Sequence, residues 1–376
     1  MYNTTFNNNF IDADTIEIET PEKPENILVE PFDPKKIDIT MKPMTLDLLI
    51  KRMKEHEINL DTKFQRQHGL WGKIEQSRLI ESLLIRIPLP AFYFDGTNDN
   101  NWLIVDGLQR LSTLNSFVVN QDLALENLEF LSQFHGLYYK DLPRQMQRRI
   151  EETQVTAFII NPGTPSQVKF NIFKRINTGG LTLEPQEIRH ALNQGIPADF
   201  LEDLANNPDF KKATCNLIKT DRMQDREFVL RFLAFNITPY TLYTPDLDKF
   251  LNNAMEILST LSKEERSQLQ LKFEKAMVAS YKLFENDAFR KRYNKSDKRK
   301  PINKALFETW AVNLGNLPLT DINILTERKN TLIESFIKEL NTNKKFENSI
   351  TTGTSQPNSV RIRFETVIKL IKEVLK

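Results

Sequence analysis

The segment from Ala91 to Val118 places the strongest constraint on what this chain can fold into. Aromatic and β-branched residues in AFYFD and NWLIV flank the turn-forming residues GTNDN, which is the pattern of a β-hairpin. The apolar spacing then changes, because Leu111, Leu114 and Phe117 recur at helical intervals. A hairpin that runs directly into a helix predicts a mixed domain, in which helices cover a sheet.

Neighbouring segments extend this mixed pattern in both directions. Thr45 is placed to cap a helix, and a second helix, IEQSRLIESLLIRI, stops before the sequence PLP. Residues 153–160, TQVTAFII, read as another strand. Thr164 is placed to cap the next helix, which the pair Gly179 and Gly180 would end, and PQEIRHAL opens one more.

Strand signals largely disappear beyond about residue 195. Apolar residues there recur at the spacing of core-facing helices, and the polar segment 341–359 reads as a long loop. We therefore expect an α+β chain with a flexible arm at 1–30, a mixed α and β domain at 31–195 and an all-helical domain at 196–376. The helical stripes are Phe228, Phe232, Phe235; Leu247, Leu251, Ala254, Leu258; Leu332, Phe336, Leu340; and Val360, Phe364, Val367, Ile371.

Composition excludes several classes of protein. The 376 residues carry 51 Lys and Arg against 50 Asp and Glu, so the overall charge gives no reason to bind nucleic acid. The single cysteine, Cys215, excludes an intrachain disulfide and a cysteine-based zinc site. The most apolar stretch, LLIRIPLPAFYF, is interrupted by Arg86 and two prolines, and the N-terminus lacks the pattern of a secretory signal. The sequence thus favours a cytoplasmic protein without a membrane partner.

The polar residues between the second hairpin strand and the following helix form a candidate anion site. Gly107 permits a tight turn, and the N-terminus of the helix presents unpaired backbone N–H groups. Arg110 could add a bidentate phosphate contact, Asp106 could hold a divalent metal ion, and Gln109 and the Ser112 hydroxyl lie within one turn. The alternative is an ordinary Asp-Gly turn beside a surface arginine.

Three further stretches gather polar residues near predicted helix ends or in loops. The turn in KRINTGG presents backbone N–H groups with little side-chain bulk, and PQEIRHAL follows it. FQRQHGLW places polar residues in a loop before Trp71. Simpler explanations are an arginine that offsets the helix dipole and a surface loop held by one tryptophan. The candidate ligand-binding residues are Gln65, Arg66, Arg175, Asn177, Gly179, Gly180, Glu187 and Arg189.

These motifs together resemble the N-terminal domain of the GmrSD-type restriction endonucleases. FQRQHGLW, LIESLLIRIPLPAFYF, VDGLQRLSTL and FKRINTGGLTLEPQEIRHAL follow the order and spacing of that family over roughly residues 30–195. In the C-terminal half, REFVLRFLAF and INKALFETW are also similar to members of the family.

The resemblance implies a ParB/sulfiredoxin-like fold that binds and hydrolyses a nucleoside triphosphate with Mg²⁺, in proteins that mostly serve defence against phage or modified DNA. It implies catalytic roles for Asp106, Gln109 and Arg110, places Gly107 at the nucleotide, and assigns the other candidate residues to the same pocket. One position departs from the family pattern, because Leu108 stands where the first glutamine of the motif is expected. If that glutamine positions water or phosphate, hydrolysis would be slow or absent while binding survives.

Histidine content bears on the nuclease that family members often add at their C-terminus. An HNH nuclease needs histidine, and the four histidines are His56, His68, His135 and His190. We therefore expect no HNH site in the C-terminal half, and the effector nuclease is expected on a separate protein.

The basic segment 289–300, FRKRYNKSDKRK, is a candidate DNA contact. Seven Lys and Arg with interleaved Phe289 and Tyr293 suit phosphate contact and base stacking, although such segments are also common as solvated loops. The leading hypothesis is a nucleotide-binding, NTP-hydrolysing regulator of a defence system. The alternatives are a non-enzymatic DNA-binding or adaptor protein, and a nuclease in its own right.

Overall fold

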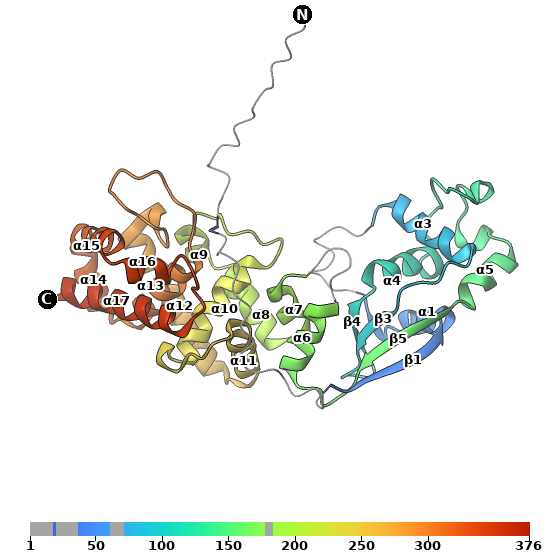
Figure 1. Ribbon diagram of the computed structural model, residues 1–376, viewed down its shortest axis with the longest axis horizontal. Helices are drawn as coiled ribbons and strands as arrows, with labels where there is room; N and C mark the ends of the chain where they lie inside the picture. Colours follow the sequence, from blue (N-terminus) through green and yellow to red (C-terminus); the bar gives the residue numbers. More distant parts are fainter. Residues whose placement is uncertain (1–17, 20–36, 61–70, 177–182) are drawn as a thin grey trace, which may run out of the picture. The chain divides into compact units, whose positions relative to one another are not determined.

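The computed structural model describes residues 18–19, 37–60, 71–176 and 183–376, which belong to two compact units (Figure 1). The sheet unit spans Glu30–Leu192, and the helical unit spans Asn193–Lys376 together with Ile18 and Glu19 near the N-terminus. The first unit is mixed and the second is built from helices, so the prediction of an α+β chain with a helical C-terminal region is confirmed.

The sheet unit is organised around one five-stranded sheet with the order β1-β5-β3-β4-β2. The predicted hairpin is present, because β3 and β4 are antiparallel and Phe94 pairs with Ile104. β5 lies parallel to β3 and antiparallel to β1, and β2 is parallel to β4. The strands are β1 (Ile39–Thr45), β2 (Ile58–Asn59), β3 (Phe92–Asp95), β4 (Trp102–Asp106) and β5 (Gln154–Ile160).

Edge strand β1 was not predicted from the sequence. It contains Pro43, which cannot donate a ladder hydrogen bond and is therefore confined to sheet edges. Three of its seven residues are exposed, so its apolar alternation is weak. The strand forms because β5 offers it a partner along its whole length, from Ile39 with Ile160 to Thr45 with Gln154.

Helices cover both faces of the sheet. Ile104 and Phe94 pack with the apolar residues of α1, α3, α4 and α5, while Val105 and Ile160 pack with those of α6 and α7. The predicted cap of α1 is present, since Thr45 accepts a bond from the Leu48 N–H. The helices are α1 (Leu46–Lys54), α3 (Lys73–Leu84), α4 (Leu108–Leu114), which continues as the π-helical turn η3 (Asn115–Val119), α5 (Arg144–Glu151), α6 (Ser166–Ile176) and α7 (Pro185–Leu192).

The start of α6 differs from the prediction. The helix begins at Ser166, and the hydroxyl of Thr164 donates to the carbonyl of Asp38 at 3.5 Å, so Thr164 joins two loops. The predicted end of this helix at Gly179 and Gly180 lies outside the described residues.

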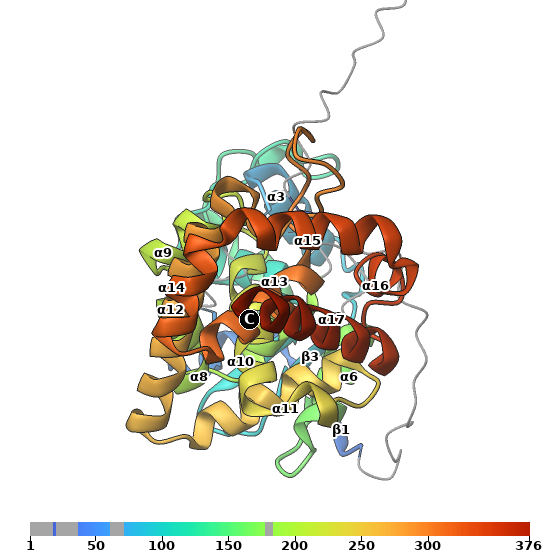
Figure 2. The same ribbon diagram turned by 90° about the vertical axis from the view of Figure 1, so that its left-hand side faces the viewer.

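The helical unit confirms all four predicted apolar stripes, which lie in α10, α11, α15 and α17. Figure 2 shows α15, α16 and α17 toward the viewer. None of the helices in the described part of the chain combines the length and the apolar character that a membrane span requires. The helices are α8 (Ile196–Ala205), α9 (Pro208–Ala213), α10 (Gln224–Ile237), α11 (Leu247–Thr260), α12 (Lys263–Phe284), α13 (Lys304–Asn316), α14 (Leu319–Glu327), α15 (Lys329–Thr342), α16 (Lys344–Ser349) and α17 (Pro357–Leu375).

The predicted loop 341–359 is wrong in part, because it contains α16. Asn343 caps this short helix by accepting a bond from the Phe346 N–H at 3.1 Å, and the Phe346 side chain is fully buried. Phe346 and Ile350 are both buried, but one pair of apolar residues in a polar segment is too short a pattern to predict a helix, so tertiary packing decides the structure here.

Candidate functional site

The strand–helix corner, Val105–Arg110, is a tight turn between β4 and α4. Gly107 adopts φ = 102°, in the left-handed region that glycine tolerates best. A Cβ at this position would lie 2.5 Å from Cδ1 of Phe92, so the space also requires glycine. The sequence expectation that Gly107 makes a sharp turn is therefore met by both conformation and packing.

Backbone donors gather at the start of α4. The first N–H groups of a helix have no intrahelical partner. For the N–H groups of Leu108 and Arg110, no acceptor lies among the residues that the structure describes. With η3 the helical segment runs from Leu108 to Val119, and its N-terminus favours an anion.

The Arg110 side chain is engaged by groups of its own chain. Its guanidinium donates to the carbonyls of Pro90 and Ala91, the latter at 3.1 Å, and to Asp106 Oδ2 at 2.8 Å. It also lies over the ring of Phe92, 4.5 Å from the centroid, and the residue is only 8% exposed. These internal bonds occupy the guanidinium in this conformation, and the expected bidentate phosphate contact stays a prediction. Arg110 fixes the entry of β3 against the corner.

Asp106 is the carboxylate at the corner, and its side chain remains 25% exposed. Burial raises the pKa of this carboxyl, although the charge of Arg110 and the Gly107 N–H act in the opposite direction. No group of three or more His, Cys, Asp or Glu suited to a metal ion occurs among the described residues. A Mg²⁺ ion held with a nucleotide needs only one or two carboxylates, since phosphates and water supply the remaining ligands.

Gln109 joins the corner to the end of the FQRQHGLW motif. Its side-chain Oε1 accepts a bond from the backbone N–H of Trp71 at 2.8 Å. The structure therefore brings two of the predicted motifs together, although Gln65 and Arg66 lie outside the described residues. Ser112 is half-buried one turn further along α4.

Leu108, where the sequence departs from the family, points into the apolar core. It is 9% exposed and belongs to the cluster that includes Leu111 and Phe92. The departure thus places an apolar side chain in an apolar environment. In this conformation, residue 108 contributes its backbone N–H to the corner, while its side chain faces away.

Helix α7 carries an unusual set of buried polar side chains. Glu187 is fully buried and accepts a bond from the Glu184 N–H at 2.6 Å, and Arg189 is 2% exposed and lies over the ring of Phe170. α7 and Val105 share one apolar cluster, in which Ile188 takes part. Of the other predicted pocket residues, Arg175 is exposed at the end of α6, and three lie outside the described residues: Asn177, Gly179 and Gly180.

Glu81 is a buried carboxylate that was not singled out from the sequence. Its carboxylate is 3% exposed and accepts the backbone N–H groups of Glu129, Phe130 and Leu131 at 2.7–2.9 Å. Burial opposes ionisation, but these three donors lower the pKa of Glu81 below its ordinary value. The available signal was a charged residue among the apolar positions of α3, one residue after the buried Ile80.

The basic segment 289–300 is largely committed to internal contacts. Phe289 is 2% exposed and packs on Phe307 with 4.7 Å between ring centroids, so the prediction that it stacks on bases is wrong. The Tyr293 hydroxyl donates to Glu347 at 3.1 Å. Bonds to carboxylates or carbonyls engage Arg290, Lys291, Arg292 and Lys295, whereas Lys298, Arg299 and Lys300 are exposed.

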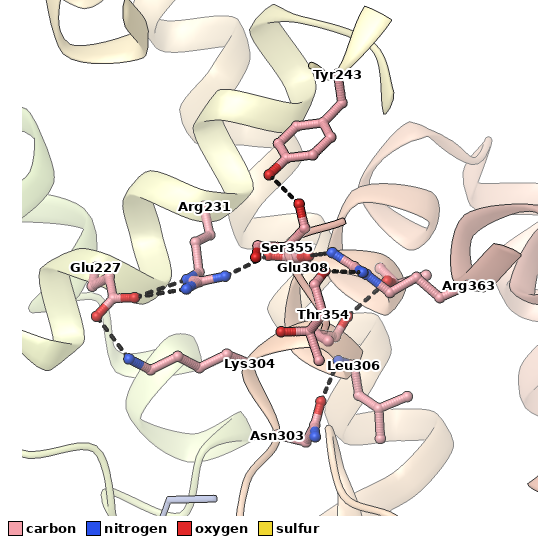
Figure 3. Close-up of polar contacts among 12 residues, drawn as sticks. Glu227, Arg231, Tyr243, Asn303, Lys304, Leu306, Glu308, Thr354, Ser355 and Arg363 are labelled. Atoms are coloured by element: carbon pink, nitrogen blue, oxygen red, sulfur yellow. Dashed lines mark hydrogen bonds and ion pairs between the residues drawn. The ribbon is translucent and has the colours of Figure 1, made fainter. Parts of the chain in front are cut away.

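The C-terminal motifs REFVLRFLAF and INKALFETW meet in a buried charge network (Figure 3). Glu308, fully buried on α13, bonds Arg231 of α10 at 3.0 Å and Arg363 of α17. Glu227 bonds Arg231 at 2.9 Å and Lys304 at 2.7 Å. Burial disfavours the charge on Arg231, but the two carboxylates outweigh it and raise the pKa. The network joins three helices and is closed to solvent at Glu308.

Comparison with known proteins agrees with the sequence motifs. Residues 48–193 match the family model described as the GmrSD restriction endonuclease, N-terminal domain. No curated protein and no solved structure matches the chain. The match covers the corner, α3 and α7, and indicates a component of a restriction-like defence system. Residues 48–193 of this chain therefore belong to the GmrSD N-terminal domain family.

Proposed function

We propose that the protein is a nucleotide-binding regulatory component of a restriction-like defence system, that it hydrolyses a nucleoside triphosphate, and that it acts on a separate effector protein. The sheet unit would be a variant of the ParB/sulfiredoxin-like fold. The observation that carries the proposal is the corner, where the turn at Gly107 starts α4 with the N–H groups of Leu108 and Arg110 lacking an acceptor among the described residues. The family match supports the nuclease-system context.

The corner would bind phosphate through its backbone, while the Arg110 side chain would hold the turn in place. The phosphates would accept bonds from the backbone N–H groups at the start of α4, which the helix dipole strengthens. Arg110 is assigned to positioning, because its guanidinium holds Pro90, Ala91 and Asp106. This assignment replaces the direct phosphate contact expected from the sequence.

Magnesium, when bound with the nucleotide, would neutralise charge on the phosphates, and Asp106 is the corner carboxylate that could hold it. Asp106 remains one-quarter exposed, so one face of its carboxylate is accessible. For orienting water we prefer Gln109 to Glu187. Gln109 is half-buried and fixed by Trp71, whereas Glu187 is fully buried and already bonds Glu184.

Binding and turnover together test this proposal. The full chain is titrated calorimetrically with ATP, GTP, CTP and UTP in Mg²⁺, and released phosphate is measured. We expect micromolar to millimolar binding of at least one nucleotide, loss of turnover in Gln109→Ala with unchanged thermal stability, and weaker binding in Asp106→Asn. Arg361→Ala, on the exposed face of α17, is the matched control. Unchanged binding and turnover in both corner variants would rule out the site.

A DNA-binding or adaptor protein without turnover is the second candidate. The exposed cations Lys298, Arg299 and Lys300 favour it. A protein of this class would shift duplex DNA in a salt-dependent way, would release no phosphate, and would lose the shift when these three residues are changed to Ala. Phosphate release that depends on Gln109 would exclude this alternative.

A further inference from the structure

Two residues near the N-terminus, Ile18 and Glu19, pack on the helical unit, although the residues they contact there lie far along the sequence. Ile18 forms a parallel bridge with Ile302, and the Glu19 N–H donates to the Ile302 carbonyl at 2.9 Å. Ile302 forms an antiparallel bridge with Arg290 on its other side. Ile302 is therefore bridged on both sides, by Arg290 and by Ile18, and the second bridge is a minimal form of β-augmentation.

Side chains reinforce this backbone pairing. Ile18 packs against the apolar core of the helical unit. The Glu19 carboxylate bonds Lys291 Nζ at 2.5 Å through one oxygen and Asn303 Nδ2 at 2.9 Å through the other. Lys291 and Asn303 are 9% and 4% exposed, so the carboxylate is received by two largely buried donors.

Asn303 links the bound segment to the framework of the helical unit. Its Oδ1 accepts the Leu306 N–H at 2.8 Å and so caps α13, the helix that carries Glu308. The carboxylate of Glu19 thus lies near the N-terminus of α13, where the helix dipole favours a negative charge. The apolar contact, the backbone pairing and the charge therefore favour an extended segment with an apolar residue followed by a glutamate.

We propose that Lys291, Ile302 and Asn303 form a docking site for an extended segment in which glutamate follows an apolar residue, and that Ile18 and Glu19 of the same chain occupy this site. Ile302 and Asn303, the first residues of the motif INKALFETW, would then serve to dock this segment. The proposed nucleotide site does not use this motif. The inference is independent of nucleotide binding.

Docking of the arm has a consequence for the basic segment 289–300. Glu19 neutralises Lys291, so the arm and any anionic ligand of this segment compete for the same cation. A tethered segment acts at an effective concentration on the order of millimolar. A separate acidic peptide would therefore displace the arm only at comparable concentrations.

Hydrogen exchange of the full chain tests the docking directly. In the parent protein the Glu19 amide should exchange at least about tenfold more slowly than in a free peptide, because it is bonded to Ile302. Glu19→Lys and Lys291→Glu should each abolish this protection, and the double variant should restore most of it. The Asn303 amide, bonded to the Phe289 carbonyl at 2.9 Å, is the internal control and should stay protected in every variant.

Free-peptide exchange at Glu19 in the parent chain would overturn the proposal, as would a double variant that exchanges as fast as either single variant. Competition provides an independent measurement. A synthetic peptide of residues 12–24 at millimolar concentration should accelerate exchange at Glu19 of the chain, and the same peptide with lysine at position 19 should not. Equal effects of the two peptides would refute the site.

Sedimentation distinguishes the source of the docked segment. A monomer with a protected Glu19 amide supports docking within one chain. A dimer that dissociates on Glu19→Lys would show that a second copy supplies the segment and would overturn the intrachain assignment.

Discussion

The strand–helix corner and the charge network of the helical unit both enclose an arginine bonded to a carboxylate, yet they differ in what surrounds the pair. At the corner, Asp106 remains 25% exposed, and the N–H groups of Leu108 and Arg110 have no acceptor within the described part of the chain. In the network, Glu308 is fully buried and bonds Arg231 and Arg363. The first pair supports the turn between β4 and α4 and includes a partly exposed carboxylate, whereas the second joins three helices.

This difference separates a candidate binding site from a structural core. A buried ion pair is weak evidence for function, because such pairs also fix the packing of helices. The backbone donors of Leu108 and Arg110, which have no acceptor among the described residues, distinguish the corner, and the arginine itself does not. The comparison predicts that variants of the network affect stability alone, whereas loss of Arg110 at the corner affects stability and binding together.

Removing Glu308 should have the largest effect. Glu308→Ala leaves Arg231 and Arg363 buried without their shared carboxylate, and breaking such a pair costs about 3–5 kcal/mol. Thermal unfolding of the helical unit measures the loss, and nucleotide affinity of the folded protein should not change. Glu365→Ala, in an exposed pair with Arg361, should leave the melting temperature nearly unchanged. A stable Glu308→Ala protein would show that the network does not hold the helices together.

Arg110→Ala should destabilise the sheet unit by about 2–3 kcal/mol, because it leaves the carbonyls of Pro90 and Ala91 without their donor. Nucleotide affinity should fall with it, since the corner loses its support. Arg110→Lys keeps the charge but cannot bond three acceptors in one plane. Its stability and nucleotide affinity should therefore lie between those of the parent protein and of Arg110→Ala. If Arg110→Ala lowers affinity without lowering stability, the arginine contacts phosphate directly and the positioning role is wrong.

Gly107→Ala should cost about 1–3 kcal/mol from its left-handed conformation, with an added cost from contact with Phe92. Gly163→Ala is the matched control, because Gly163 has φ = 91° in the same unit with open space around its Cβ position. Denaturant unfolding of both variants separates the two costs. Equal destabilisation would mean that Phe92 moves aside and that packing does not restrict the corner.

The smallest effect is expected from the pH dependence of the Glu81 contacts. The folded-state pKa of Glu81 lies below its ordinary value of 4.5, so its contribution to stability is complete above that pH. The contribution is lost as the pH falls through the folded pKa. Unfolding free energies of the parent and of Glu81→Gln, measured from pH 7 to pH 3, should therefore converge toward the acid end. Parallel curves would exclude ionised Glu81 as the acceptor of the 129–131 N–H groups.

Local patterns predicted much of the fold and less of the site. The hairpin, α1 and the four helical stripes follow from periodicity and capping, which act over a few residues. Strand β1 and helix α16 depend on parts of the chain that are distant in the sequence. Strand β1 forms by pairing with β5, and α16 forms because the core buries Phe346.

The candidate site shows the same limit. The sequence places Asp106, Gly107 and Arg110 at a strand-to-helix turn, and the structure agrees. It does not indicate where the guanidinium points, because Pro90 and Ala91 come close only when the sheet forms. The docking of Glu19 on Asn303 spans 284 positions and has no local signal.

Hydrogen exchange at the corner amides tests the central claim most directly. The amides of Leu108 and Arg110 in the full chain are followed with Mg²⁺ alone and with Mg²⁺ and each nucleotide at saturating concentration. The account predicts that one nucleotide slows exchange at both amides by tenfold or more, while the Asn303 amide of the helical unit is unaffected. Nucleotide binding that leaves both corner amides at their free rate would contradict it.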